Sequence, residues 1–293
     1  MNYKVIEEKD RVILEGVEDF ELQHILECGQ CFRWYREADD SYTLVAHNRI
    51  LNIAKQNDQI LFNHTNIEDF YGIWKAYFDL DRDYRGIKKV LCENDPVMER
   101  AIEKGHGIRI LKQDEWETLI SFIISSNRGI PLIKKSIEEL SEKYGQFIGI
   151  YGNRKHYAFP QPEALLNRTI EEIQLCRTGY RAKYIVDAAA IVGERQMDIY
   201  AIHNLDTDMA RRNLLRINGV GPKVADCILL FSMGKFDAFP IDVWVKRVME
   251  YFYLQEDMPL KTIQDYGQKR FGKYAGFAQQ YLFYYARELG IGK

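Results

Sequence analysis

A lysine directly follows a glycine-rich turn in the stretch "INGVGPKVADCI", residues 217–228. Pro222 suits the first turn of a helix, so Lys223 should lie near a helix N-terminus, where several backbone amides lack an internal partner. The positive helix end and partial burial both disfavour the protonated form of this side chain. An uncharged amine is a nucleophile and forms Schiff bases. Lys223 is therefore a candidate for covalent chemistry. The alternative is a solvated or phosphate-neutralising lysine.

An aspartate, Asp242, opens the next apolar run with helical spacing, in "AFPIDVWVKRVMEYF". A carboxylate at this position accepts hydrogen bonds from the first free amides of a helix. It can also orient Lys223 and stabilise positive charge that develops on a sugar. The two roles are compatible, so we expect the two side chains to act together.

The glycine turn indicates how these residues would meet a partner. Two apolar helical stretches within residues 207–233 flank Gly219 and Gly221, which permit positive φ and close backbone approach. The free amides after the turn would point at an anion, most naturally a phosphate, with Arg211, Arg212 and Arg216 adding Coulomb attraction. This predicts a helix-hairpin-helix grip on a DNA backbone. The alternative is an ordinary corner between two helices.

Charge is distributed unevenly along the chain. The 293 residues carry 40 Lys and Arg against 43 Asp and Glu, a net charge of −3. Residues 1–100 hold 13 basic and 20 acidic side chains, a net of −7, whereas residues 101–293 hold 27 and 23, a net of +4. The second part is therefore the one expected to face an anion.

The cysteines and the hydropathy of the chain indicate the cellular compartment in which the protein is expected to work. Five scattered cysteines, at positions 28, 31, 92, 176 and 227, argue against a disulfide framework and for a reducing environment. Cys28 and Cys31 form a single C-x-x-C, which is a poor zinc site without a second pair, and no other cluster suggests a metal. With no apolar run of roughly 18 residues and no signal-like N-terminus, we expect no membrane span and a prokaryotic cytoplasm, close to the nucleoid.

Hydrophobic periodicity predicts an α+β fold. Five short runs rich in β-branched and aromatic residues indicate an antiparallel meander up to about residue 65, with turns at Asn48-Arg49 and Asn57-Asp58. Helical spacing dominates from there on. We expect a β-rich domain with flanking helices over residues 1–100 and a helical body over residues 101–293. The expected helices are 67–78, 96–104, 114–124, 130–144, 163–166, 170–175, 182–193, 207–214, 223–233, 242–252, 260–270 and 274–289.

Six blocks together resemble the 8-oxoguanine DNA glycosylases of the helix-hairpin-helix–Gly/Pro–Asp superfamily, in that family's order. They are "CGQCFRW", "SFIISSN", "GYRAKYI", "GVGPKVADCI", "FPIDVWV" and "GFAQQYLF", and they span residues 28 to 283. The resemblance implies a monomeric DNA repair enzyme that flips 8-oxoguanine out of duplex DNA. It implies that Lys223 displaces the base through a Schiff base and that β-elimination nicks the strand, with help from Asp242. No cofactor or metal is implied.

The resemblance also implies which residues read the flipped base. The Gln279 amide would bond the Watson–Crick edge, the Phe283 ring would stack on the base, and Cys227 would line the other side. The Gly29 carbonyl would accept from N7–H, which 8-oxoguanine has and guanine lacks, a distinction worth about 1–3 kcal/mol. The alternatives are a core phenylalanine, a small buried cysteine and a turn glycine.

Four further positions would contact the duplex. By resemblance, Asn127 fills the space left by the flipped base, Tyr180 is the wedge and Arg181 contacts the orphaned base. The alternatives are a helix cap for Asn127 and surface polarity for the other two. Leu132 stands where members that demand an opposite cytosine have an arginine, so the preference for the opposite base should relax. Trp244 replaces a histidine that lies near the lesion phosphate in eukaryotic members, which affects that contact and not the reaction type.

Two rival classes remain at this point. One is a glycosylase for alkylated bases with a similar β domain; such enzymes lack the lysine, so Lys223 speaks against it. The other is a non-catalytic DNA-binding protein that uses the hairpin as a grip, and the pairing of Lys223 with Asp242 speaks against that. The cysteine quartet of the endonuclease III relatives is absent near the C-terminus, so no iron–sulfur cluster is expected.

Overall fold

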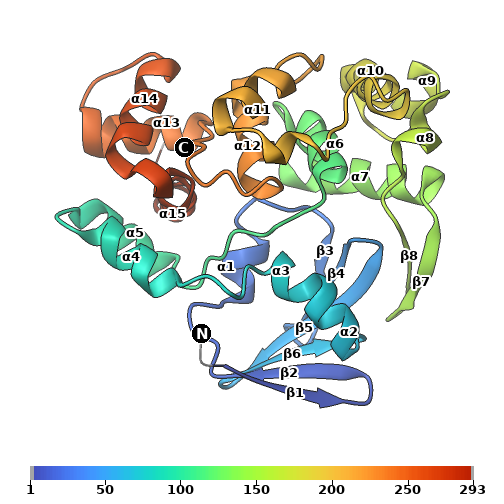
Figure 1. Ribbon diagram of the computed structural model, residues 1–293, viewed down its shortest axis with the longest axis horizontal. Helices are drawn as coiled ribbons and strands as arrows, with labels where there is room; N and C mark the ends of the chain where they lie inside the picture. Colours follow the sequence, from blue (N-terminus) through green and yellow to red (C-terminus); the bar gives the residue numbers. More distant parts are fainter. Residues whose placement is uncertain (1–2, 292–293) are drawn as a thin grey trace.

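The computed structural model describes residues 3–291, and it places a twisted sheet beneath a larger helical body (Figure 1). This confirms the predicted α+β class. The sheet is built from β1 (Lys4–Glu8), β2 (Arg11–Glu15), β3 (Trp34–Arg36), β4 (Tyr42–Ala46), β5 (Arg49–Gln56) and β6 (Gln59–Asn63).

The sheet is not a simple meander, which corrects the expectation from the sequence. Its order is β1-β2-β6-β5-β4-β3, with every pair antiparallel. After β2 the chain leaves the sheet, forms the short helix α1 (Leu22–Leu26), and re-enters at the opposite edge as β3. Because of this detour, the segment 27–33 contacts both parts of the molecule: Cys28 and Phe32 pack in the core of the helical body, and Cys31 packs in the core on the sheet.

The two predicted hairpin turns differ in accuracy. β5 and β6 are joined at the predicted Asn57-Asp58, with Asn57 at φ 52°. β4 and β5 are joined by His47 and Asn48, at φ 48° and 60°, one residue earlier than predicted. Two successive positive φ values characterise the tight turn that matches the twist of a hairpin, and Asn48 tolerates the left-handed region.

The helices follow the predicted segments closely, but the nine-residue helix at Tyr84–Cys92 and the short 3-10 turns at Gly179–Arg181 and Ile202–Asn204 were not predicted. They are α2 (Ile67–Asp69), the π-helical η1 (Phe70–Trp74), α3 (Lys75–Tyr77), α4 (Tyr84–Cys92), α5 (Pro96–Lys104), α6 (Glu115–Ser125), α7 (Ile130–Tyr144), α8 (Pro162–Leu165), α9 (Ile170–Gln174), η2 (Gly179–Arg181), α10 (Ala182–Gly193), η3 (Ile202–Asn204), α11 (Thr207–Leu214), α12 (Pro222–Phe231), α13 (Val243–Met249), the π-helical η4 (Glu250–Leu254), α14 (Leu260–Phe271), η5 (Gly272–Tyr274) and α15 (Ala275–Leu289). Within residues 3–291, no helix has the length and apolar character needed to cross a bilayer.

One hairpin lies outside the predicted elements. β7 (Phe147–Tyr151) pairs with β8 (Arg154–Tyr157) inside the helical body, with a register shift at Gly149. The hairpin reaches down toward the sheet in Figure 1, and a Cβ placed on Gly149 would lie 3.2 Å from Ile50 on β5. It therefore ties the helical body to the sheet.

Two hydrophobic cores divide the molecule. One lies on the sheet and extends along the chain to Leu80, with Leu111 added from further on. The other fills the helical body and takes in side chains of α4 and α5, among them Ile87 and Met98. α5 packs against α15. Residue 100, the predicted end of the first domain, thus falls inside a helix that packs with the body.

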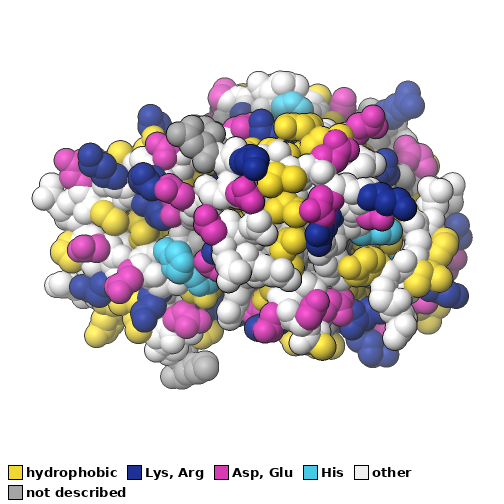
Figure 2. All heavy atoms as spheres, turned by 90° about the horizontal axis from the view of Figure 1, so that it is seen from below, with side chains coloured by type: hydrophobic (Ala, Val, Ile, Leu, Met, Phe, Trp, Pro, Cys, Tyr) yellow, Lys and Arg dark blue, Asp and Glu magenta, His cyan; other side chains and the backbone are white. Residues whose placement is uncertain are grey.

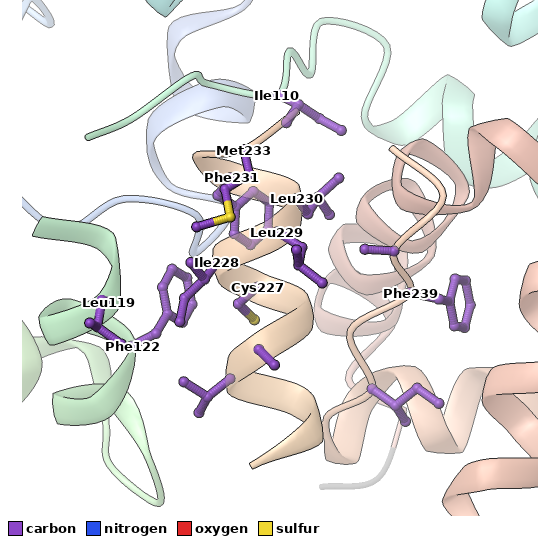
Figure 3. Close-up of a cluster of buried hydrophobic side chains, with 14 of the residues drawn as sticks. Ile110, Leu119, Phe122, Cys227, Ile228, Leu229, Leu230, Phe231, Met233 and Phe239 are labelled. Carbon is purple, nitrogen blue, oxygen red and sulfur yellow. The ribbon is translucent and has the colours of Figure 1, made fainter. Parts of the chain in front are cut away.

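Helix α12 occupies the middle of the helical core. Figure 3 shows side chains from Cys227 to Phe231 pointing from α12 toward neighbouring helices, with Leu119 and Phe122 facing them from α6. The rings of Phe122 and Phe231 are stacked, with centroids 5.6 Å apart. The helix that begins at the glycine turn is therefore fixed against α6, the helix that ends just before Asn127.

Candidate active site

The predicted helix-hairpin-helix is formed by α11 and α12 and the turn between them. Gly219 has φ +86°, and a Cβ there would lie 2.6 Å from Cγ of Tyr184, so both conformation and space require glycine. Gly221 is the N-cap of α12, is exposed, and no side chain caps the helix. The first amides of α12 thus have no capping side chain, as an anion grip needs.

A buried ion pair locks the two helices of the hairpin together. Asp226 on α12 has a side chain only 1% exposed, and it accepts from Nε of Arg211 on α11 at 2.7 Å. The amide of Gln264 on α14 also donates to Asp226. The sequence suggested that Arg211 attracts phosphate. Instead its guanidinium is committed to Asp226 and Asp208, so its role is to hold the hairpin.

Lys223 lies in the first turn of α12 and is partly buried. Its Nζ is 5.1 Å from the centre of the Phe122 ring, so the amine is directed toward α6. Cys227 lies one turn further along and is buried. Burial raises the pKa of the Cys227 thiol to about 11, while the nearby Lys223 amine opposes the rise.

Asp242 is the N-cap of α13, as its position in the sequence predicted. Oδ1 accepts from the backbone N–H of Trp244 and of Val245, each at 2.9 Å. Its charge contributes to raising the pKa of Cys227, after burial and the charge of Asp226. The Cys227 thiol is therefore within electrostatic reach of both the Lys223 amine and the Asp242 carboxylate.

The base-reading residues predicted from α15 meet the loop after α1. Gln279 is 5% exposed, and its Oε1 is buried without a hydrogen-bond partner among the described residues. Gly29 has φ +82°, and a Cβ there would lie 3.4 Å from the Phe283 ring. The fold thus brings Gly29 close to Phe283. One helical turn before Phe283, the buried Gln279 amide has an oxygen that can still accept a hydrogen bond.

The C-x-x-C of this loop faces inward. The Cys28 thiol donates to the Ile25 carbonyl at 3.1 Å, and the Cys31 thiol lies 3.8 Å from the Leu26 carbonyl. Burial raises the pKa of Cys28 to about 11 and that of Cys31 well above its usual value. Both thiols stay protonated at neutral pH and pack as small buried groups. Among residues 3–291, no group of three or more potential ligands could hold a metal ion.

Sequence reasoning missed the residue that anchors this loop. Gln30 is fully buried, and its Nε2 donates to the carbonyls of Ile25 and Arg109, both at 2.8 Å. Its Oε1 accepts from the Leu111 amide at 2.9 Å. A glutamine beside a glycine signals little by itself, because two of its three partners, Arg109 and Leu111, lie about eighty positions away in the chain.

The predicted duplex-contacting residues also lie together, with one change of role. Asn127 is exposed in a left-handed turn at φ 50°. Arg181 is only 7% exposed; it donates to the Asn127 carbonyl at 3.2 Å and, through Nε, to the Ser126 carbonyl at 3.0 Å. Arg181 is therefore not a surface residue, since it holds the Asn127 turn. The N-cap of α7 is Gly129, so the alternative reading of Asn127 as that cap is wrong.

Tyr180 stands at the edge of a hollow beside the hairpin. It is 55% exposed, and the Arg181 guanidinium lies 4.4 Å from its ring centre. The hollow has a volume of about 330 Å³ and joins the end of α6 to the glycine turn. Its lining residues are Ile123, Ser126, Tyr180, Arg181, Tyr184, Gly219, Val220 and Gly221.

Leu132 and Trp244 occupy the two positions that depart from the family pattern. Leu132 is in the first turn of α7 and is 51% exposed, which is unusual for a leucine. Trp244 is partly buried against the helical core, and the Arg247 guanidinium lies 5.9 Å from its ring. Leu132 therefore exposes an apolar side chain five residues after Asn127. Trp244 is an indole two residues after the Asp242 cap.

Basic side chains do not dominate the face on the sheet side. Figure 2, which views the molecule from below, shows Lys and Arg interspersed with Asp and Glu among the coloured residues. Attraction of a polyanion to this face would be weak. The anion-binding features described above, the uncapped start of α12 and the hollow beside it, lie instead on the helical body.

Comparison with known proteins agrees with this geometry. The family described as HhH-GPD superfamily base excision DNA repair protein matches residues 120–270, and the 8-oxoguanine DNA glycosylase N-terminal domain matches residues 12–119. The chain belongs to this superfamily of DNA glycosylases and, within it, to the 8-oxoguanine DNA glycosylase family of bifunctional N-glycosylase/DNA lyases.

Individual relatives place it more closely. A probable N-glycosylase/DNA lyase of Methanothermobacter thermautotrophicus is 33% identical over 234 residues, covering 73% of this chain and 74% of the relative. The structure of MBOgg1 in complex with a low-affinity DNA ligand is 49% identical with a TM-score of 0.96, covering 99% of this chain and 100% of that one. The 8-oxoguanine glycosylase/lyase of Clostridium acetobutylicum, in complex with double-stranded DNA containing cytosine opposite 8-oxoguanine, is 44% identical at the same TM-score and coverage.

Proposed function

We propose that Lys223 is the nucleophile that excises 8-oxoguanine from duplex DNA. Its Nζ attacks C1′ of the flipped nucleotide, the glycosidic bond breaks and the base leaves with the bonding electrons and a proton. The ring-opened sugar is then held as a Schiff base. Loss of a C2′ proton expels the 3′ phosphate by β-elimination and nicks the strand. The observation that carries the proposal is the Lys223 amine held inward between Phe122 and Cys227 at the start of α12.

Asp242 supports this chemistry electrostatically. Its Oδ1 is fixed by two backbone amides of α13, so the carboxylate needs no reorganisation when positive charge develops on the sugar. The uncapped start of α12, with Gly219 and Gly221 before it, takes a backbone phosphate. In this proposal the deoxyribose lies between the Asp242 carboxylate and the turn that binds the phosphate.

Recognition of the lesion is assigned to the region where Phe283 on α15 lies beside the loop after α1, which would form the base-binding pocket when DNA is bound. Gln279 supplies a buried amide with an unused acceptor, and Phe283 supplies a ring face. The Gly29 carbonyl accepts from N7–H of 8-oxoguanine and is repelled by the N7 lone pair of guanine. Cys227, buried one turn after Lys223, lines the side of the pocket nearer the nucleophile.

The remaining residues hold the distorted duplex. Asn127 fills the gap left by the flipped nucleotide, and Tyr180 wedges beside it from the rim of the hollow. Arg181 holds the Asn127 turn and faces the orphaned base. Leu132 offers that base no hydrogen-bond donor, so cytosine, adenine, guanine and thymine are accepted opposite the lesion with modest differences. We further propose that the enzyme acts as a monomer on chromosomal DNA in a prokaryotic cytoplasm.

Trapping with borohydride tests the nucleophile. Borohydride added to the protein and an 8-oxoguanine duplex should reduce the Schiff base to a stable covalent adduct. Lys223→Gln should bind the duplex and give no adduct. Lys183→Gln is the matched control, because this substitution removes the same charge near the hairpin. Lys183 is exposed and lies beside Tyr184, the residue that packs on Gly219. The control should trap like the parent.

The same experiment separates the rival functions. A glycosylase for alkylated bases would release its base by hydrolysis, so the parent would give no adduct with any lesion. A non-catalytic DNA-binding protein would shift the duplex in a gel and leave every base in place. Trapping by Lys223→Gln at the parental level would show that another amine is the nucleophile, and would overturn the assignment.

A further inference from the structure

Helix α15 contacts the lesion-reading loop through a second set of side chains. Gln280 is 2% exposed, and its Nε2 donates to the Cys28 carbonyl at 3.1 Å. Two turns on, Nη1 of Arg287 donates to the Glu27 carbonyl at 3.0 Å. Positions 280, 283 and 287 recur with helical spacing, so these two donors flank Phe283 on one stripe of the helix.

The bond from Gln280 acts on the peptide that leads directly into Gly29. The Cys28 carbonyl and the Gly29 N–H belong to one planar unit, so fixing the carbonyl fixes the plane. Gly29 has φ +82°, and a Cβ there would lie 3.4 Å from the Phe283 ring. Its own carbonyl belongs to the next peptide plane, so holding the Cys28 carbonyl fixes one of the two planes that meet at this flexible residue. The Cys28 side chain is turned away, toward the Ile25 carbonyl. The amide of Gln280 is thus the side-chain donor that reaches this carbonyl from α15.

We infer that Gln280 is a positioning residue for lesion recognition, which holds the Gly29 carbonyl in register with Gln279 and Phe283. Because all three lie on α15 or against it, one helix sets the distance between the group that reads N7 and the groups that read the rest of the base. The inference rests on the proposed function and adds a residue to it. Gln280 is buried and touches no substrate; it works through the loop.

Removing the donor should affect base recognition more than strand nicking. An unpaired carbonyl in a buried site lets the Cys28–Gly29 peptide turn toward any other donor, which moves the acceptor away from N7. A preformed abasic site has no base to read, so its nicking depends on Lys223 and not on this loop. The ratio of the two activities therefore reports the positioning role, whereas general damage to the fold would lower both together.

The test compares Gln280→Met with the parent in single-turnover assays. Methionine keeps the length and volume of the side chain and removes the donor. We expect excision of 8-oxoguanine to fall ~5- to 50-fold and nicking of a preformed abasic duplex to stay within about twofold of the parent. Gln268→Met is the matched control, because the Gln268 amide also donates to a backbone carbonyl, that of Asp237 at 3.2 Å, far from the loop. It should leave both activities unchanged.

Each outcome decides the inference. Parental excision by Gln280→Met, or an equal fall in excision and nicking, would overturn it while leaving the proposed function standing. If Gln280→Met does not fold, Gln280→Glu replaces the donor by an acceptor at the same length, and a selective loss of excision at least as large is expected. Failure of the parent itself to excise 8-oxoguanine would sink the proposed function instead, and the parental lane of each assay reports it.

Discussion

The nucleophile region and the recognition region differ in how their buried side-chain acceptors are paired. Around Lys223 the carboxylates are paired: Asp226 is bound by Arg211 and Gln264, and Asp242 accepts from two amides. In the recognition region the Gln279 Oε1 is buried without a partner among the described residues. A buried unpaired acceptor costs stability, so its presence points to a ligand that supplies the donor. The paired carboxylates keep the side chains around Lys223 in position, whereas the Gln279 Oε1 can accept a hydrogen bond from a substrate.

The two regions also differ in how the chain assembles them. Lys223 and Asp242 come from one continuous stretch of hairpin and helix caps, so local rules of helix termini place them. Gly29 and Phe283 come from opposite ends of the chain, and they lie close together only because the chain leaves the sheet after β2 and α15 contacts the loop that follows α1. The first region can be recognised from a short motif, whereas the second requires the whole fold.

Replacement of Asp242 by asparagine should give the largest effect and separates its two roles. The asparagine oxygen can still accept from the Trp244 and Val245 amides, so the cap and the melting temperature should be preserved. The negative charge is lost, and both excision and abasic-site nicking should fall by on the order of 10²–10³. Single-turnover rates on the two substrates, together with a thermal melt, measure this. Rates near those of the parent would reduce Asp242 to a helix cap.

Gln279→Leu should have a smaller effect than Asp242→Asn, and it should lower base excision without changing strand nicking. Leucine fills similar space and removes a buried amide whose Oε1 has no partner, so stability should hold or rise. Loss of hydrogen bonds to the base should lower excision of 8-oxoguanine about 10- to 50-fold, with nicking of an abasic duplex unchanged. A parallel fall in nicking would contradict the division of labour between α12 and α15.

Sequence patterns predicted the helices well and the sheet less well, for physical reasons. Helical spacing over ten or more residues, with glycine or proline near the ends, located segments such as 130–144 and 182–193 to within a residue or two. The strand β3 has three residues and α1 has five, which is too short for either period to register. The hairpin β7–β8 is interrupted by Gly149 and Gly152, which obscure its alternation. The predicted strand order was wrong because β2 pairs with β6, which is distant in the sequence, and local patterns do not indicate such a pairing.

The same distinction holds for the site. Asp242 as a cap and Gly219 at positive φ follow from local rules, and both are observed. The inward turn of Arg181 toward Asn127 and the clamp from Gln280 to Cys28 depend on contacts between distant segments. Composition and spacing carry no information about such contacts. The roles assigned in catalysis and DNA binding stay predictions until the variants are measured.

The smallest expected effect concerns the base opposite the lesion. Leu132 is 51% exposed in the first turn of α7, so Leu132→Arg should change the unfolding free energy by no more than about 0.5 kcal/mol. A guanidinium there can donate to cytosine where leucine cannot, and the preference for cytosine should sharpen about three- to tenfold. Excision opposite cytosine, adenine, guanine and thymine measures it. Leu175→Arg, at a site 72% exposed and outside the hollow, adds the same charge as a control. A parent that already demands cytosine would show that another side chain reads the orphaned base, and Arg181 would then be the first to replace.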